Sequence, residues 1–287
     1  MKIVKAMRVE QWLKNLLIFT PFLTTGNFNF QKLYSLIGLF IGFSLIVSST
    51  YILNDLIDIE TDKIHPKKKF RPIPSGYLSS TQWYMISGAF LVLGIIIVFY
   101  IQQVAVIYVT MYLVLTLAYS LKLKFVKFFD ILCIALLFTL RIFVGGAPLS
   151  IPISNYLILF TFSTSIAIVS GKKLSILKNN EIPDTKIKEF LKNNYETKNL
   201  EYLLYLSFFS TVIIYTIWIF NIKSPEVELI NLLFLIISVM FLVLFIYRYL
   251  KEFINNNTED IFDTMKNNKS LFYFALAFVV FSLLGIF

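Results

Sequence analysis

The sequence predicts an all-α membrane protein, a polytopic bundle of about nine transmembrane helices. Composition is the first observation: 57% of the 287 residues are apolar, only 15% are charged and the mean hydropathy is +0.75, which lies far outside the range of a soluble domain. The second is length, because apolar runs of roughly 20 residues, enough for a helix to cross the hydrocarbon core, recur along nearly the whole chain.

The apolar runs give nine expected membrane-spanning helices. They lie over residues 14–31, 33–53, 81–101, 104–121, 129–148, 153–171, 201–221, 227–248 and 270–287. The first run is the least regular, because Pro21 and the polar stretch from Thr24 to Asn29 interrupt it, so a count of eight is the alternative. No internal repeat or linker divides the chain, and we expect a single domain over residues 1–287.

The lysines and arginines are concentrated in alternate loops. The cation-rich segments are the N-terminus and residues 54–80, 122–127, 172–198 and 248–269. The intervening loops carry only Lys32 and Lys223. By the positive-inside rule, this asymmetry places the N-terminus and the charged loops in the cytoplasm and the C-terminus outside, in the inner (cytoplasmic) membrane. It also explains the formal charge of +9, so we expect a lipid bilayer and no nucleic acid as partner.

The longest polar segment, Gly171 to Asn199, contains "DTKIKEFLKNNYE". In a helix, Ile187, Phe190 and Leu191 share a face opposite the lysines. Such a helix fits either the membrane surface or the cap of a cytoplasmic pocket, and an ordinary solvated helix is an equal alternative.

The stretch "NDLIDIETDKIHPKKKFRPIPSG", from Asn54 to Gly76, gathers four carboxylates and five cations where the second span ends. On a helix, Asn54, Asp55, Asp58 and Asp62 fall within a sector of roughly 100°. Unpaired carboxylates there would repel one another and be costly at a membrane boundary. A divalent cation removes the conflict, and Mg²⁺ takes carboxylates together with substrate phosphate oxygens. The alternative is a topology-determining loop with solvated aspartates.

The basic half of this stretch complements the acidic half. Its prolines forbid a continued regular helix, so Lys67, Lys68 and Arg71 are expected on a stiff loop that folds over the carboxylates. Carboxylates for the metal and cations for the remaining phosphate charge are what a Mg²⁺-diphosphate site needs.

A second polar cluster lies between the fourth and fifth spans. Tyr119, Lys122 and Lys124 are expected on the same cytoplasmic side as the carboxylates, although the lysines also fit simple topology signals. Asp130 is the first charged residue of the fifth span, where the helix N-terminus stabilises a carboxylate. We expect this carboxylate to complete the metal shell. Arg141 lies eleven residues further along on nearly the same face, and either belongs to the site or extends to the outer surface.

These elements together resemble the UbiA-type superfamily of intramembrane prenyltransferases. The resemblance lies in the order Asn-Asp-x-x-Asp-x-x-x-Asp, a basic loop ending "RPIPSG", and a Tyr/Lys loop leading to an aspartate. It covers nearly the whole chain and implies a nine-helix bundle that binds Mg²⁺-diphosphate at an active site on the cytoplasmic face.

Within that superfamily, four stretches are similar to the decaprenyl-phosphate phosphoribosyltransferases. They are "MRVEQWLKN" at Met7–Asn15, "YSLKLK" at Tyr119–Lys124, "LRIFVGGA" from Leu140 and "GKKLSIL" at Gly171–Leu177. This branch transfers 5-phosphoribose from phosphoribosyl diphosphate to a polyprenyl phosphate. In ordinary prenyltransferases the second motif usually has two aspartates four residues apart, whereas here Ile134 follows Asp130 at that spacing.

Each candidate site residue then has an expected role. The metal ligands are Asn54, Asp55, Asp58 and Asp62. Asp55, Asp58, Tyr119 and Lys122 are the expected catalytic residues. The other expected substrate-binding residues are Lys14, Lys67, Lys68, Arg71, Lys124, Asp130, Arg141 and Lys172. Enzymes of cell-envelope biosynthesis are the expected downstream partners, because the chain has no soluble domain for a later step.

Two other functions remain alternatives. An ordinary prenyltransferase would join a prenyl diphosphate to an aromatic or other small acceptor by means of the same first motif. A transporter would account for nine spans, but transporters place their polar groups near the midplane, whereas the densest ones here lie at the cytoplasmic ends of the predicted helices.

Overall fold

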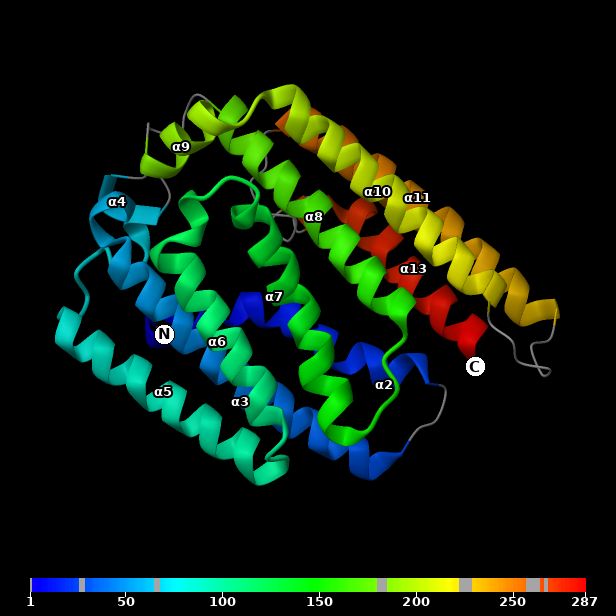
Figure 1. Cartoon of the computed structure of the whole chain (residues 1–287), viewed down its shortest axis with the longest axis horizontal. Coiled ribbons are helices and arrows are strands. Elements are labelled where there is room, and N and C mark those ends of the chain that lie inside the picture. Colours follow the sequence, from blue (N-terminus) through cyan, green and yellow to red (C-terminus); the bar gives the residue numbers. More distant parts are fainter. Residues whose placement is uncertain are drawn as a thin grey trace. The chain divides into compact units, whose positions relative to one another are not determined.

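The computed structural model describes residues 2–25, 29–64, 68–179, 185–221, 229–256, 264–265 and 268–287. All regular structure in these residues is helical, and they contain no strand (Figure 1). The chain divides into two compact units. The first comprises Met1–Ile153 and Ile182–Ile187, and the second comprises Ser154–Glu181 and Lys188–Phe287. The expectation of a single domain over residues 1–287 stays a prediction.

The first unit contains the N-terminal helices and the elements around the acidic segment. These are α1 (Lys2–Ala6), the 3₁₀ helix η1 (Val9–Phe19), α2 (Thr20–Thr24), α3 (Phe30–Ile57), α4 (Ile59–Ile64), η2 (Lys68–Phe70), α5 (Ser80–Ile101), α6 (Ala105–Leu121), η3 (Leu123–Phe125), α7 (Phe129–Gly146) and η4 (Ala147–Leu149). Side-chain caps begin the two longest helices of this unit. Asn29 accepts backbone hydrogen bonds at the start of α3, and Ser79 forms a capping box with Gln82 at the start of α5.

The second unit contains four long helices. Its elements are α8 (Asn155–Lys178), α9 (Lys186–Asn194, whose first two residues belong to the first unit), α10 (Thr197–Asn221), α11 (Leu229–Asn256) and α13 (Lys269–Ile286). Helix α8 packs against α10, and α11 packs against α13. The Tyr215 hydroxyl joins three of these helices, because it lies 2.7 Å from the hydroxyls of both Ser238 and Ser282.

Seven of the described helices are long and apolar enough to cross a membrane, and α6 is a shorter apolar helix. They account for eight of the nine predicted spans. Residues 14–31 do not form one helix: η1 ends and α2 begins within them, Gly26, Asn27 and Phe28 lie outside the described residues, and α3 begins at Phe30. The ninth span stays a prediction. Pro21 lies in the first turn of α2, where a missing N–H costs no hydrogen bond, and this explains why a new helix begins there.

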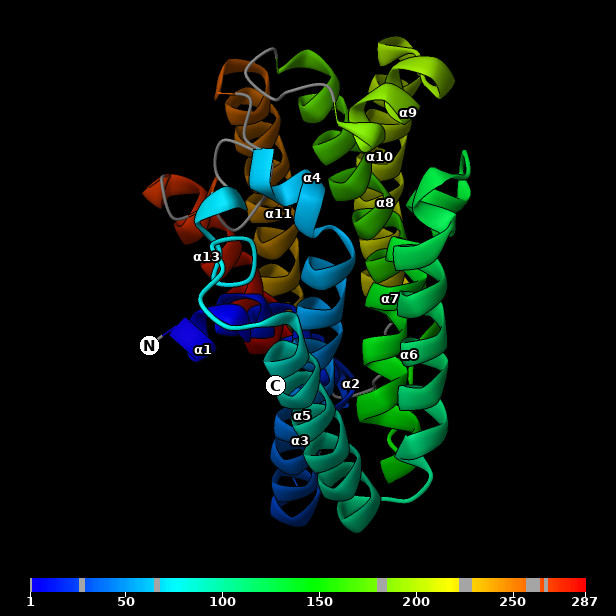
Figure 2. The same cartoon turned by 90° about the vertical axis from the view of Figure 1, so that its left-hand side faces the viewer.

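Two close helix contacts define the core of the first unit. Helices α3 and α5 run alongside each other in Figures 1 and 2, and they approach closely at Gly42 and Gly94, where a Cβ would crowd the facing backbone. Helix η1 packs on α7 at Gly145, where a Cβ would collide with the carbonyl oxygen of Ile18. The start of η1 packs against α3, where the Trp12 indole donates a hydrogen bond to the Ser48 hydroxyl (3.0 Å). The polar site lies at the C-terminal end of α3.

Candidate active site

The acidic segment lies at the junction of α3 and α4. Helix α3 ends at Ile57 and α4 begins at Ile59, so the single regular helix expected through Asp62 is interrupted at Asp58. The helical hydrogen bonds nevertheless continue, from the Asp58 amide to the Asn54 carbonyl (3.0 Å) and from the Asp62 amide to the Asp58 carbonyl (2.8 Å). The four polar residues of the motif therefore keep their helical spacing.

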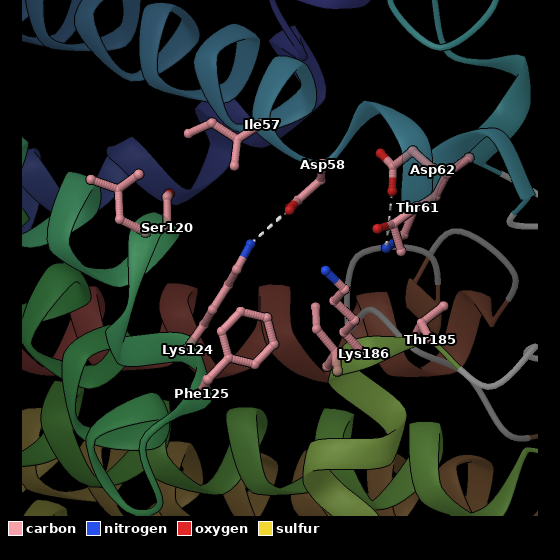
Figure 3. Close-up of a pocket in the computed structure, with 12 residues that line it drawn as sticks. Ile57, Asp58, Thr61, Asp62, Ser120, Lys124, Phe125, Thr185 and Lys186 are labelled. Carbon is pink, nitrogen blue, oxygen red and sulfur yellow. Dashed lines mark hydrogen bonds and ion pairs between the residues drawn. The ribbon is translucent and has the colours of Figure 1, made fainter.

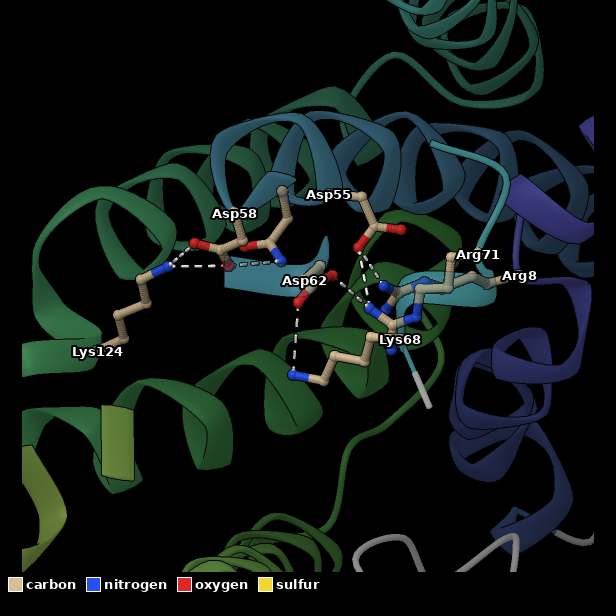
Figure 4. Close-up of polar contacts among 8 residues, drawn as sticks. Arg8, Asp55, Asp58, Asp62, Lys68, Arg71 and Lys124 are labelled. Atoms are coloured by element: carbon tan, nitrogen blue, oxygen red, sulfur yellow. Dashed lines mark hydrogen bonds and ion pairs between the residues drawn. The ribbon is translucent and has the colours of Figure 1, made fainter. Parts of the chain in front are cut away.

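The basic loop folds back over these carboxylates, as the sequence predicted. The Arg71 Nη1 atom lies 3.2 Å from Asp55 Oδ1 and 3.0 Å from Asp62 Oδ2, and so bridges the two side chains (Figure 4). Lys68 Nζ lies 3.7 Å from Asp62 Oδ1. A third cation comes from the N-terminal segment, since the Arg8 guanidinium forms an ion pair with Asp55. Asp55 and Asp62 are both buried, and three cations surround them.

Backbone conformation and an aromatic ring position Arg8. Its φ of 51° places it in the left-handed region, at the turn between α1 and η1. Its guanidinium lies over the Tyr51 ring, 4.9 Å from the centroid. Burial, and then the positive charge of Arg8, lower the pKa of Arg71, while Asp55 and Asp62 oppose that change. The two guanidiniums therefore repel each other, and the carboxylate of Asp55, which pairs with both, offsets part of that repulsion.

Asp58 has a different partner from the other two carboxylates. Lys124 Nζ lies 2.7 Å from its Oδ1 atom and 3.0 Å from its Oδ2 atom. The Lys124 side chain is 7% exposed, whereas that of Asp58 is 25% exposed. The Asn54 amide also donates a hydrogen bond to Asp58, at 3.4 Å. Lys124 lies on η3, so the predicted Tyr/Lys loop does reach the acidic motif.

Several of these charged side chains line one pocket of about 210 Å³ in the first unit (Figure 3). Its polar lining consists of Asp58, Thr61, Asp62, Lys68, Ser120, Lys124, Thr185 and Lys186. Its apolar lining consists of Ile57, Leu121, Phe125 and Ile187. Anionic and cationic side chains thus meet an apolar wall in one space, which fits an amphipathic ligand with a charged head.

The donor set fits Mg²⁺ in one specific way. Among the described residues, no group of three or more His, Cys, Asp or Glu side chains is placed to hold a metal ion. Two carboxylates, Asp58 and Asp62, do line the pocket. Mg²⁺ commonly takes one or two carboxylates and completes its shell with water and substrate phosphates. The arrangement therefore suits a metal that arrives together with a phosphate-bearing substrate.

The other predicted site residues lie in several places. Tyr119 is half-buried on α6, Lys122 is exposed at the end of that helix, and Asp130 is fully buried at the start of α7. Lys14 is half-buried on η1. None of these four lines the pocket. Lys172 lies exposed on α8 in the second unit, and Lys67 lies outside the described residues, so the roles of both stay predictions.

Arg141 follows neither of the two expected arrangements. It does not extend to a surface, because it is only 3% exposed, and it does not line the pocket. Its Nε donates to Asn15 Oδ1 at 3.0 Å, and its Nη2 donates to the Tyr112 hydroxyl at 3.1 Å. The guanidinium also lies over the Tyr112 and Phe138 rings. Arg141 therefore holds η1 against α7, which explains a buried cation inside a span.

Sequence reasoning missed several residues of the site. Arg8 is one, although it stands in the stretch "MRVEQWLKN" that carried part of the resemblance. Thr185 and Lys186 are two more, and they come from the segment that was expected either to cap a pocket or to lie on the membrane. Thr61 and Ser120 lie one residue from predicted site residues. Their hydroxyls carried no separate signal in the sequence.

Comparison with known proteins shows the family and the fold of this chain. The chain is 30% identical to the decaprenyl-phosphate phosphoribosyltransferase of Mycolicibacterium smegmatis over 76% of its own length and 70% of that protein. It is 29% identical to the Mycobacterium tuberculosis protein of the same name, over 76% and 74% of the two chains. A UbiA homologue from Archaeoglobus fulgidus bound to GPP and Mg²⁺ has the same fold, with a TM-score of 0.69, 18% identity, and coverage of 99% and 98%.

The model of the UbiA prenyltransferase family matches residues 17–276. That match reaches into both units and covers six of the seven described helices that are long enough to cross a membrane, together with the first part of α13. The protein is thus a multi-pass membrane protein, and the chain belongs to the UbiA prenyltransferase family.

Proposed function

We propose that this protein transfers 5-phosphoribose from phosphoribosyl diphosphate to a polyprenyl phosphate, with release of diphosphate, in a Mg²⁺-dependent reaction. The pocket is the observation that carries the proposal. It combines two carboxylates and three lysines with an apolar wall, and so suits a phosphorylated donor and a lipid acceptor. The identity of the sugar rests on the named relatives.

The charges around the pocket support the departure of a diphosphate. Asp58 and Asp62 would hold Mg²⁺ on the donor, with Asn54 beside them, and Asp55 would anchor Arg8 and Arg71 next to this site. The bound ion would supply charge stabilisation for the leaving group. Lys68, Arg71 and Lys124 lie against these carboxylates and would neutralise phosphate oxygens of the bound donor.

The reaction breaks one bond at ribose C1 and forms another. The bond from C1 to the diphosphate oxygen breaks, its electron pair leaves with the diphosphate, and positive charge develops on the ribose as in other glycosyl transfers. An oxygen of the polyprenyl phosphate forms the new bond to C1. This phosphate is already largely ionised at neutral pH, because its second pKa is about 6. No strong general base is therefore needed.

The lipid tail would lie along the apolar side of the pocket, next to Ile57, Leu121 and Phe125. We place the active site at the cytoplasmic face of the inner membrane, with nine membrane-spanning segments, a cytoplasmic N-terminus and an external C-terminus. Removal of a phosphate or oxidation of the sugar would require separate enzymes of envelope biosynthesis.

A labelling experiment tests the proposal. Purified protein would be incubated with Mg²⁺, a polyprenyl phosphate and phosphoribosyl diphosphate labelled in the ribose, and label would be counted in the organic extract. We expect transfer by wild type and by Glu60→Gln, an exposed carboxylate that pairs with Lys63, and no transfer by Asp58→Asn. Absence of transfer by wild type would reject the proposal.

A second candidate is prenyl transfer from a prenyl diphosphate to an aromatic or other small acceptor. The fold shared with a UbiA homologue bound to GPP and Mg²⁺ favours it. Consumption of geranyl diphosphate with such an acceptor, in the absence of ribose transfer, would support this candidate instead.

A further inference from the structure

Lys186 occupies a distinctive position in the pocket. It lies with Thr185 and Ile187, which belong to the first unit although they come from far along the chain. Thr185 beside it is 8% exposed, and both residues line the pocket. Figure 3 shows the Lys186 side chain pointing toward the side of the pocket that carries Asp58 and Thr61. Its ammonium group is therefore directed toward the charged end of the space.

The pairing of charges in the pocket leaves Lys186 available. Of the other lining cations, Lys124 is bonded to Asp58 at 2.7 Å and Lys68 lies 3.7 Å from Asp62. Lys186 forms no hydrogen bond or ion pair with any residue in the part of the chain that the structure describes. Three lysines and two carboxylates line the pocket, so Lys186 provides its excess positive charge.

The ligand for this charge must be compact and anionic. An ammonium binds a phosphate as a point charge, without the planar match that a guanidinium offers to a carboxylate. A phosphate monoester carries about 1.5 to 2 negative charges at neutral pH, more than one lysine neutralises. Thr185, the preceding residue, adds a hydroxyl to the same pocket lining.

We propose that Lys186 binds the phosphate monoester of a substrate, separately from the diphosphate whose Mg²⁺ Asp58 and Asp62 would hold. This inference deepens the proposed function and rests on it for the identity of the substrates. Two groups have the required chemistry: the 5-phosphate of the ribose donor and the phosphate of the lipid acceptor.

Binding measurements without turnover test the role of Lys186. Affinities for ribose 5-phosphate and for farnesyl phosphate would be measured by calorimetry in detergent, without Mg²⁺. The proteins would be wild type, Lys186→Met and Lys186→Arg. The matched control is Lys192→Met, an exposed lysine on the same helix that does not line the pocket. Because Lys186 is exposed, we expect all four proteins to unfold at similar temperatures.

We expect Lys186→Met to lower the affinity for one of the two ligands by about tenfold or more, because a charged hydrogen bond is lost. Lys186→Arg should keep most of that affinity. Weaker ribose 5-phosphate binding would assign Lys186 to the donor, and weaker farnesyl phosphate binding would assign it to the acceptor. Unchanged affinity for both ligands, an equal loss in Lys192→Met, or no binding of either ligand by wild type would overturn the inference. A wild-type protein that binds a ligand through Lys186 but transfers no ribose would reject the proposed reaction alone.

Discussion

Lys124 and Asp58, 66 residues apart in the sequence, form a two-oxygen ion pair at the wall of the pocket, with distances of 2.7 Å and 3.0 Å. The lysine is nearly buried and the aspartate is partly exposed. Lys124 therefore has a fixed position, and Asp58 is the partner that a ligand can reach. This pair is the contact through which η3 joins the acidic motif, and the first prediction concerns it.

Replacement of Lys124 by methionine should reduce ribose transfer at least about tenfold, because one charged contact to a phosphate or to Asp58 is lost. The rate of label transfer at saturating substrate measures this. Lys127→Met is the matched control, since Lys127 is an exposed lysine on the same loop and does not line the pocket; it should keep wild-type activity. Equal activities in the two variants would contradict the role of Lys124.

Asp55 and Asp58 should differ in what they contribute to stability. Asp55 is 2% exposed and holds both Arg8 and Arg71, so Asp55→Asn should cost about 2 kcal/mol or more of unfolding free energy. Asp58 is more exposed, and Asp58→Asn should cost about 1 kcal/mol or less. Thermal unfolding in one detergent compares them. A similar midpoint for both variants would show that the ion pairs of Asp55 stabilise little.

Asn15 should stabilise the protein without taking part in the chemistry. It is fully buried, accepts from Arg141 and donates to Ser44 at 2.9 Å. Asn15→Leu would leave a buried guanidinium without its acceptor, at a cost of about 2–3 kcal/mol. The midpoint of thermal unfolding should fall, whereas Gln11→Leu, a partly exposed amide on the same 3₁₀ helix, should leave it near wild type. An unchanged midpoint for Asn15→Leu would reject the role of this contact.

Mg²⁺ alone should stabilise the free protein very little. Asp55, Asp58 and Asp62 are each already paired with an arginine or a lysine, and a metal ion must compete with those partners. Diphosphate together with Mg²⁺ should raise the unfolding midpoint clearly, because the phosphate oxygens accept the displaced cations. A large shift with Mg²⁺ alone would instead indicate a preformed metal site.

Much of the site was predictable because its signal is local. The spacing of Asn54, Asp55, Asp58 and Asp62 depends only on helical geometry, and the hydrogen bonds across Asp58 preserve it. The return of Arg71 to the carboxylates follows from a proline-rich loop next to opposite charge. The apolar runs likewise gave the long helices, because length and composition are sufficient to identify a span.

What was missed depends on contacts between distant segments. Residues 14–31 were interpreted as one helix because of their apolar content, whereas Asn15 is turned inward to bond Ser44 and Arg141. Arg8 and Lys186 reach the site only through tertiary packing, and neither has a local pattern that separates it from a topology-determining cation. A single sequence contains the residues of such contacts but does not say which residues meet.

The ion pairs of Asp55, Asp58 and Asp62 also have a consequence for the end of each catalytic cycle. Four cations, Arg8, Lys68, Arg71 and Lys124, share three carboxylates, so each of these charges has a partner within the protein. In the proposed reaction, the four cations would release the departing diphosphate and pair with these carboxylates again. We therefore expect weak product inhibition by diphosphate and a fast return to the starting state, because the protein itself competes with its product.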